Sequence, residues 1–464
     1  MMLLQLMTNK IRYRGLVPDY YAKPGKSKQT GIRAIYKIII ISMICLNVPS
    51  LKAQKPLVLS LDSAVLYAID HNKTLINSKY AIQKSAQKIK ETIAVGLPQA
   101  NATLDYNNFL GASASIQLNP EAPPAVIEFN PTSNVKGSIS QMIFNGNYFV
   151  GVQLSKLAKT ITEQSYQKDE LNVKEQTIQA YCMILAGERI SDIIRENKTN
   201  VLLLYEKTMN LANAGILEQT DAKKLSVMVA SVDNALKSSE RQVELGYNLL
   251  RLQLGLAPDQ EIILSSSLLD IAQLYKVQTA LADTFNIERN IDFQMVAMQG
   301  EIAQKTIDLR KSSYLPSVVA FYSRTEKLKK PLFDMTPKNV LGFTLTVPIL
   351  SGGQRLAQLD QAKIDYDINT NTKDLLTQQL TLQDSQIRYT YNNLLEQLAT
   401  QKENKDIAKE VLDKMNLKYT QGVVSSLELT SANTDYLNAE TTYTSIMLQI
   451  LNAEISLRKI NSKL

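Results

Sequence analysis

The sequence predicts a mostly α-helical protein in which β-hairpins interrupt very long helices. Three observations lead to this fold class: a run without glycine or proline that exceeds the helices of ordinary domains, short segments in which apolar and polar residues alternate, and an internal duplication of the whole pattern. With 45% hydrophobic and 20% charged residues, the 464-residue chain has the composition of a folded protein.

The long helices are predicted by the absence of helix-breaking residues. From Gln354 to Gln421 the chain has 68 residues with neither glycine nor proline. As one continuous helix, this run would be on the order of 100 Å long, because each residue adds about 1.5 Å. Segments 152–214 and 216–254 contain one glycine each. In the last segment, apolar residues three or four positions apart predict packing along a second long helix. These residues are Tyr436, Ala439, Tyr443, Ile446, Ile450, Ala453, Leu457 and Ile460.

Short segments with a different period lie between the long helices. In segment 340–347 leucine and phenylalanine alternate with glycine and threonine, and segment 101–107 alternates in the same way. Segments 135–144 and 318–324 are weaker versions. Period-two alternation predicts strands with one apolar face, close to the length of about 9 to 11 residues that crosses a bilayer at a tilt. Two polar loops with prolines, 113–134 and 325–339, are expected to join the strands in pairs outside the sheet.

The order helix, hairpin, long helix, turn and helix occurs twice, with a period of about 210 residues. Three landmarks return: a Leu-Pro pair before the hairpin, a motif ending in glycine after it, and a glycine followed six residues later by an acidic residue. The first copies are Leu97-Pro98, Ile143-Phe144-Asn145-Gly146 and Gly215 with Asp221; the second are Leu315-Pro316, Ile349-Leu350-Ser351-Gly352 and Gly422 with Glu428. The expected junctions between hairpins and helices are Pro98, Gly146, Pro316, Pro348, Gly352 and Gly353.

These patterns divide the chain into four expected parts: an N-terminal extension with a signal peptide, a first repeat, an equatorial segment beside the helices, and a second repeat. The parts are 1–53, 54–255, 256–283 and 284–464. In the first repeat we expect helix 60–96, strands 99–112 and 134–145, and helices 147–214 and 216–254. In the second we expect helix 284–314, strands 316–326 and 339–350, and helices 353–421 and 423–462.

The positive net charge of +7 is concentrated at the N-terminus. Residues 1–53 contain nine Lys or Arg and one Asp, which leaves 42 basic and 43 acidic residues in the rest of the chain. Nucleic-acid binding through a basic patch is therefore excluded, because such binding needs clustered cations. Arg33 and Lys37 precede the apolar run 38–48, and Ala53 follows it, which predicts an export signal and a mature chain starting near Gln54.

The mature residues offer little for catalysis. After residue 53 there is one cysteine, Cys182, and one histidine, His71. Disulfide frameworks and most transition-metal sites are thereby excluded. We interpret Cys182 as a buried, inert thiol and His71 as a polar residue late in a helix. The acidic residues are scattered over helix faces without a paired-carboxylate or Ser-His arrangement, so we expect neither an enzyme nor a bound cofactor or metal.

The number of strands requires further copies of the chain. Four strands are too few to close, and each open edge in lipid would leave backbone groups unpaired at several kcal/mol apiece. Since the smallest closed membrane barrels have about eight strands, a dimer or a trimer would be sufficient, and the twelve strands of a trimer would enclose a lumen.

Over nearly all of its mature length the chain resembles the TolC-type outer-membrane efflux proteins. The resemblance depends on the duplication, the helix start Leu59-Ser60-Leu61-Asp62-Ser63-Ala64, the exit Val347-Pro348-Ile349-Leu350-Ser351-Gly352-Gly353, and the two turns with glycine and an acidic residue. It implies a homotrimer with a 12-stranded membrane β-barrel, in the cell outer membrane, and a coiled α-helical tunnel in the periplasm. It also implies that a periplasmic adaptor (membrane fusion) protein and an inner-membrane RND or ABC transporter are partners.

The same resemblance implies a gate at the periplasmic helix tips. Tyr419 and Asp221 match positions that tie neighbouring tips together by a hydrogen bond, and Glu428 matches an acidic ring whose members raise one another's pKa. Gly215 and Gly422 would shape the surface that docks the adaptor. Val424 and Ser431 replace an arginine and an acidic residue common in the family, which predicts a weaker lock and less cation selectivity.

The helix-tip residues also have a purely structural interpretation. Asp221 and Glu428 could cap helices after a turn, since a helix N-terminus favours negative charge. Gly215 and Gly422 are expected to be left-handed residues at helix ends. The sequence leaves the gate and cap interpretations of Glu428 open.

A periplasmic or secreted coiled-coil scaffold without a pore is the competing function. The aromatic content of 6% and the absence of tryptophan favour it, because membrane barrels usually carry aromatic girdles. The alternating hairpin pairs favour a channel, since a scaffold has no need for them. The sequence does not distinguish among drugs, metal ions and proteins as cargo.

Overall fold

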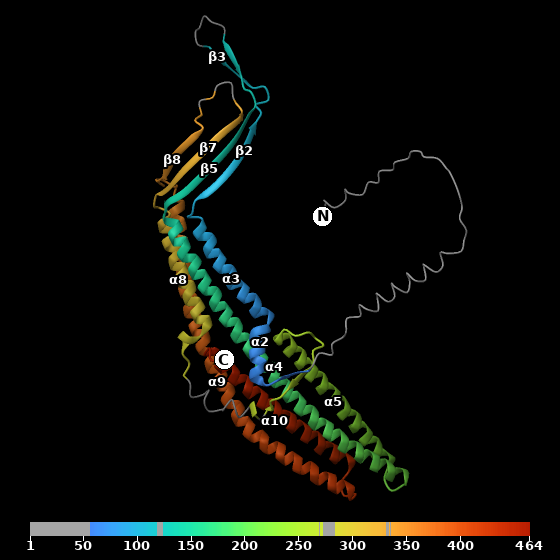
Figure 1. Ribbon diagram of the computed structural model, residues 1–464. Helices are drawn as coiled ribbons and strands as arrows, with labels where there is room; N and C mark the ends of the chain where they lie inside the picture. The colour runs from blue at the N-terminus through green and yellow to red at the C-terminus, as the bar shows by residue number, and fades with distance from the viewer. Residues whose placement is uncertain (1–55, 118–123, 269, 272–283, 331–333, 335) are drawn as a thin grey trace, which may run out of the picture. The chain divides into compact units, whose positions relative to one another are not determined.

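The computed structural model describes residues 56–464, apart from residues 118–123, 269, 272–283, 331–333 and 335 (Figure 1). The expected signal segment 1–53 lies outside the described residues, as does part of the equatorial segment. The unit from Pro56 to Leu464 has a sheet at one end and the turns of two long helical hairpins at the other (Figure 1).

Two antiparallel hairpins of long helices dominate the unit. The first consists of α4 (Gly146–Asn213) and α5 (Gln219–Leu254), and the second of α9 (Gln354–Thr420) and α10 (Ser426–Ile460). Helix α4 also contacts α10, so the hairpins lie side by side (Figure 1). The shorter helices are α2 (Leu61–His71), α3 (Lys73–Ala94) and α8 (Ile291–Ser312). None of the helices in the described part of the chain is both long and apolar enough to cross a membrane.

The expected helices 60–96 and 284–314 are each interrupted near their start by a capping asparagine. Asn72 separates α2 from α3, and its Oδ1 accepts a hydrogen bond from the Thr74 backbone N–H at 2.8 Å. Asn290 starts α8 after the short 3₁₀ helix η1 (Ile287–Arg289), with the equivalent bond from Asp292 at 2.9 Å. Because an asparagine oxygen satisfies the free N–H groups of a new helix, each helix begins again there. Both α3 and α8 then have 22 residues, a further sign of the duplication.

The main sheet contains four antiparallel strands in the order β2, β5, β7, β8. Their bounds are Gln99–Asn107, Thr132–Asn145, Ser317–Lys329 and Asn339–Thr346. Each repeat contributes one pair, and the repeats meet at β5 and β7, where for example Ser138 is opposite Ser323. Strands β2 and β8 are the two edges, and neither has an outer neighbour among the described residues.

Two of the expected strands end early. Strand β2 stops at Asn107 and not at residue 112, because Leu110 and Gly111 have positive φ angles that turn the chain away. A second hairpin follows within the expected loop 113–134, with β3 (Ser113–Ile116) paired to β4 (Ala125–Glu128). Strand β8 ends at Thr346 and not at residue 350, since Pro348 has no N–H to continue a ladder.

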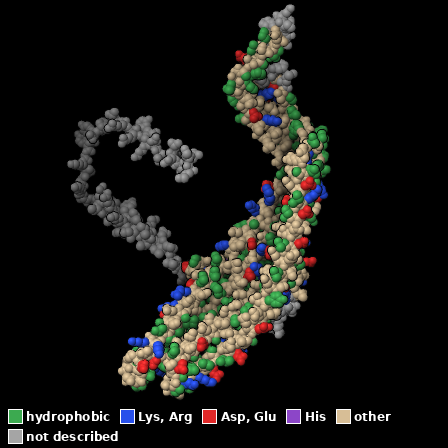
Figure 2. Space-filling view, turned by 180° about the vertical axis from the view of Figure 1, so that it is seen from behind, with side chains coloured by type: hydrophobic (Ala, Val, Ile, Leu, Met, Phe, Trp, Pro, Cys, Tyr) green, Lys and Arg blue, Asp and Glu red, His purple; other side chains and the backbone are tan. Residues whose placement is uncertain are grey.

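The two faces of the sheet differ in polarity. The paired register places Ala100, Ile139, Tyr322 and Leu341 in one row across the sheet. The next row, on the opposite face, contains Asn101, Ser138, Ser323 and Val340. Nothing among the described residues covers the apolar face: Leu341 is 81% and Phe343 76% exposed. Hydrophobic side chains lie open at the strand-bearing end in the space-filling view (Figure 2).

The main core lies where the middle of α4 meets α2, α5 and α10. Tyr181 is fully buried there, and its hydroxyl donates to the Leu59 carbonyl at 2.9 Å and accepts from the Ser266 N–H at 3.2 Å. This links α4 to a parallel pair of short strands, β1 (Leu57–Leu59) and β6 (Ile262–Leu264). Cys182 is fully buried in the same core, and burial raises its thiol pKa to about 12. The thiol is therefore protonated and unreactive at neutral pH.

Candidate functional site at the helix tips

The two helix tips have the same turn geometry. Gly215 and Gly422 both have φ of 73°, and nothing lies within 4 Å of a Cβ built on either residue. Each turn closes with a bond from the residue after the glycine, Ile216 to Leu211 and Val423 to Lys418. The left-handed interpretation of both glycines is therefore confirmed. A side chain would fit in the space around them but would strain the backbone.

Glu428 caps the start of α10. Its Oε2 accepts hydrogen bonds from the Ser425 backbone N–H at 2.8 Å and from the Ser425 hydroxyl at 2.9 Å, while its own N–H donates to Ser425 Oγ at 3.3 Å. This is a complete capping box. The N–H and hydroxyl of Ser425 lower the pKa of the Glu428 carboxyl. Within one chain the carboxylate is thus stabilised, the reverse of the mutual pKa rise expected for an acidic ring.

Tyr419 and Asp221 each connect one hairpin to the other, through different partners. The Tyr419 hydroxyl, at the end of α9, lies 3.3 Å from the Thr208 hydroxyl on α4. Asp221 Oδ1, in the first turn of α5, accepts from the Ser426 hydroxyl at 2.8 Å. Burial raises the pKa of Tyr419, and the nearby charge of Asp221 adds to this rise. Tyr419 and Asp221 therefore lie near each other. Within the chain, Tyr419 bonds to Thr208 and Asp221 bonds to Ser426.

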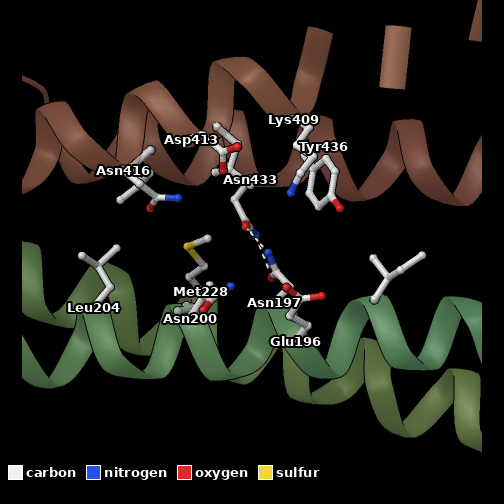
Figure 3. A pocket seen from close by; sticks show the side chains of 14 residues that line it. Glu196, Asn197, Asn200, Leu204, Met228, Lys409, Asp413, Asn416, Asn433 and Tyr436 are labelled. Carbon is white, nitrogen blue, oxygen red and sulfur yellow. Dashed lines mark hydrogen bonds between the residues drawn. The ribbon is translucent and has the colours of Figure 1, made fainter. Parts of the chain in front are cut away.

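A polar contact that the sequence interpretation missed lies farther from the tips, between α4 and α10. Asn433 Nδ2 donates to Asn197 Oδ1 at 3.3 Å, and Asn197 Nδ2 donates back to Asn433 Oδ1. Both side chains are at most 5% exposed. Figure 3 shows them pointing at each other across a small cavity between the hairpins, with Tyr436 and Lys409 nearby. The only sequence signal was an asparagine within each apolar pattern.

The junction residues lie at the ends of the strands and helices they were expected to separate. Pro98 stands between α3 and β2, and Pro316 between α8 and β7. Gly146 begins α4 beside the end of α8, where an added Cβ would lie 2.9 Å from Leu315 Cδ1. Gly352 and Gly353 precede α9 with φ of 57° and 86°. Glycine is thus needed at position 146 for close packing, and at positions 352 and 353 for a left-handed turn.

Comparison with known proteins finds similar sequences and similar folds. The family model described as outer membrane efflux protein matches residues 286–461. Over these residues the chain is similar to the outer membrane efflux proteins. It is 20% identical over 370 residues to the outer membrane protein TolC of Escherichia coli K12, which covers 76% of this chain and 72% of that protein.

Solved structures of outer-membrane proteins share the fold. The outer membrane protein VceC of Vibrio cholerae superposes with a TM-score of 0.66 at 13% identity, covering 87% of this chain and 96% of that one. The CmeC outer membrane channel of Campylobacter jejuni gives 0.67 at 15% identity, covering 87% and 85%. The mostly helical fold predicted from the sequence is confirmed. No three His, Cys, Asp or Glu side chains of the described residues are grouped as metal ligands would be.

Proposed function

We propose that this chain is one subunit of a homotrimeric outer-membrane channel, the exit duct of a tripartite efflux or type I secretion system. In this assembly twelve strands, four from each copy, form the membrane barrel, and the long helices continue it as a tunnel in the periplasm. The channel conducts cargo passively. An inner-membrane RND or ABC transporter supplies the energy, and a periplasmic adaptor connects the two.

The single observation that supports this function best is the uncovered four-stranded sheet. Its apolar face is exposed to a degree that a water-soluble surface rarely shows, and its edge strands β2 and β8 have no outer neighbour in the described part of the chain. Lipid on one face and a neighbouring copy at each edge would satisfy both features, because backbone groups in a bilayer need partners. The polar opposite face would then line the lumen.

The helices also carry an apolar surface that suits neighbouring copies. On α9, four large apolar residues at seven-residue intervals are 55% to 76% exposed in the single chain. They are Ile368, Leu375, Leu382 and Tyr389. A stripe with this period is typical of a helix that packs against another helix. The stripe supports the association of copies along the helices as well as through the sheet.

At the tips, we propose that Asp221, Tyr419 and Glu428 belong to the gate and that the turns at Gly215 and Gly422 dock the adaptor. The bonds Thr208–Tyr419 and Asp221–Ser426 hold the end of the second hairpin against the first. Opening the tunnel by spreading the tips requires these bonds to break. Glu428 keeps its capping role and, in a trimer, would add a ring of three carboxylates.

Conductance and mass together test the channel. The purified chain in detergent is expected to have the mass of three copies and, in planar lipid bilayers, to produce discrete conductance steps. A monomer without conductance that osmotic shock releases from cells would establish the scaffold function instead.

The gate has its own test in the double variant Tyr419→Phe with Asp221→Ala. Loss of both connections between the hairpins is expected to raise single-channel conductance, because the closed tips are less firmly held. Tyr366→Phe, which alters an exposed tyrosine on the same helix outside the apolar stripe, serves as the control. Unchanged conductance in the double variant would show that these residues are not part of the gate.

A further inference from the structure

Buried polar side chains occupy five of six positions that lie seven residues apart along α10 and its C-cap. Five of these side chains are at most 6% exposed: Ser426, Asn433, Glu440, Glu454 and Asn461. The sixth position holds Met447, which packs against the main core. A seven-residue interval returns to the same side of a helix that packs against another. These six positions, the α10 polar series, form a line along the inner face of the helix and its C-cap.

The first three members reach the first-repeat hairpin. Ser426 bonds to Asp221, and Asn433 exchanges two hydrogen bonds with Asn197. Glu440 lies 3.4 Å from Arg189 of α4 and 4.0 Å from Lys405 of α9. The contacts with α4 thus repeat with nearly the same interval, since Asn197 and Arg189 are eight residues apart.

A slip of the second hairpin by seven residues along α4 would break every one of the contacts with the first-repeat hairpin. In one direction Asn433 would face Ile190 and Glu440 would approach the buried Cys182. In the other, Asn433 would face Leu204 and Glu440 would approach Glu196. Each slip leaves a buried amide without a partner and puts a carboxylate in an apolar core or beside another carboxylate.

The apolar residues alone discriminate less between these alignments. Apolar residues also recur at seven-residue spacing, Ile194 and Val201 on α4 and Leu429 and Tyr436 on α10, so a slipped pair would still bury apolar side chains against each other. Buried polar pairs in coiled coils can define one alignment even though apolar residues would pack more stably. The same chemistry is present here at three successive layers.

We propose that the α10 polar series fixes the axial alignment of the second hairpin against α4, with the Asn197–Asn433 pair as the deciding layer. The alignment determines where the helix tips meet, since Thr208 and Tyr419 face each other only when these layers are matched. The proposal concerns the fold of the described unit and holds whether or not the assembled chain conducts.

The test replaces the pair by leucine, Asn197→Leu with Asn433→Leu, in the full chain. Spin labels on cysteines at the exposed positions Thr199 and Thr442 report the distance between α4 and α10, in samples diluted with unlabelled chain so that only distances within one chain are recorded. Cys45 is replaced by serine, and the buried Cys182 stays unlabelled because its pKa is raised.

The leucine pair is expected to give a second distance population, from a slip of about 10 Å along the helix axis, that is, seven residues at about 1.5 Å each. The melting temperature is expected to equal or exceed that of the unchanged chain. Each single variant is expected to melt lower than the double variant, because one buried amide loses its partner.

Asn200→Leu is the matched control, since it makes the same change at an exposed position lining the same cavity. It is expected to keep the single distance. One unchanged distance in the leucine pair would overturn the proposal, and so would single variants that melt like the unchanged chain.

Discussion

The helical end of the described unit buries large apolar side chains, and the sheet exposes them. In the helices, large apolar residues such as Leu225 and Leu250 are fully buried, and polar residues such as Asn433 and Glu454 are enclosed with them. In the sheet, Leu341 and Phe343 are among the most exposed side chains. The helices therefore carry their own core, whereas the described residues leave the apolar face of the sheet uncovered.

The difference follows from how each part satisfies its backbone. A helix pairs its N–H and C=O groups internally, so a pair of helices needs only one shared apolar line to be stable. A sheet satisfies its outer edge only by adding strands. Stability should therefore be most sensitive to substitution of buried apolar residues in the helices and of exposed apolar residues in the sheet.

The largest effect is expected where the helices pack. Leu225→Ala on α5 removes a fully buried side chain and should lower stability by about 2–5 kcal/mol, through lost burial and the cavity left behind. Val227→Ala, two residues away and 70% exposed, should change it by less than about 0.5 kcal/mol. Unfolding midpoints in detergent measure both. Equal effects would mean that Val227 is covered in the assembly.

In the sheet, the exposed residue should be the sensitive one. Phe343→Lys places a charge on the apolar face of β8, which at a bilayer midplane costs about 2–4 kcal/mol. Thr344→Lys places the same charge on the opposite face, where a lumen would accept it. Folding into lipid vesicles, followed by protease protection, should fail for the first and succeed for the second. If Phe343→Lys folded and Thr344→Lys did not, Phe343 would face the lumen and Thr344 the lipid.

The sequence predicted the fold where a single local rule is sufficient. The run from Gln354 to Gln421, without glycine or proline, corresponds to α9, which ends one residue earlier. Alternation in 340–347 corresponds to β8. The breaks at Asn72 and Asn290 were missed because asparagine is tolerated inside a helix pattern, and only its hydrogen bonds show that it caps.

The sequence predicted where the helix tips lie, but it did not predict which side chains are in contact there. Gly215 and Gly422 identified both turns, because glycine at the end of a long helical segment is a strong signal for a helix end. The partners Thr208 and Ser426 were not predicted, since they depend on how two hairpins far apart in the sequence align. Asn197 and Asn433 were missed for the same reason.

A smaller effect is expected at the helix start. Ser425→Ala removes the hydroxyl of the capping box and should lower stability by about 1 kcal/mol. Thr434→Ala, an exposed position within α10, is the control. Thermal melting of both variants tests this. A Ser425 variant as stable as its control would indicate that contacts in the assembly, and not the cap, hold the start of α10.

The last comparison concerns two carboxyl groups of α10 with opposite pKa shifts. Burial raises the pKa of Glu454, partly offset by hydrogen bonds from Arg458 and Tyr391, whereas Ser425 lowers the pKa of Glu428. For Glu454 the folded state binds the proton more tightly, so its contribution to stability falls as pH rises from the unfolded pKa, near 4.3, through the folded value. For Glu428 the contribution is present above the unfolded pKa and is lost as pH falls through the folded value.

Glutamine at each position should therefore act in opposite directions. At pH 8, Glu454→Gln is expected to melt higher than the unchanged chain and Glu428→Gln lower, and both differences should shrink toward pH 4. Melting temperatures across this range measure the sign directly. If Glu454→Gln were less stable than the unchanged chain at pH 8, the ion pair with Arg458 would contribute more than the cost of burying the charge. The buried carboxylate would then stabilise the helices.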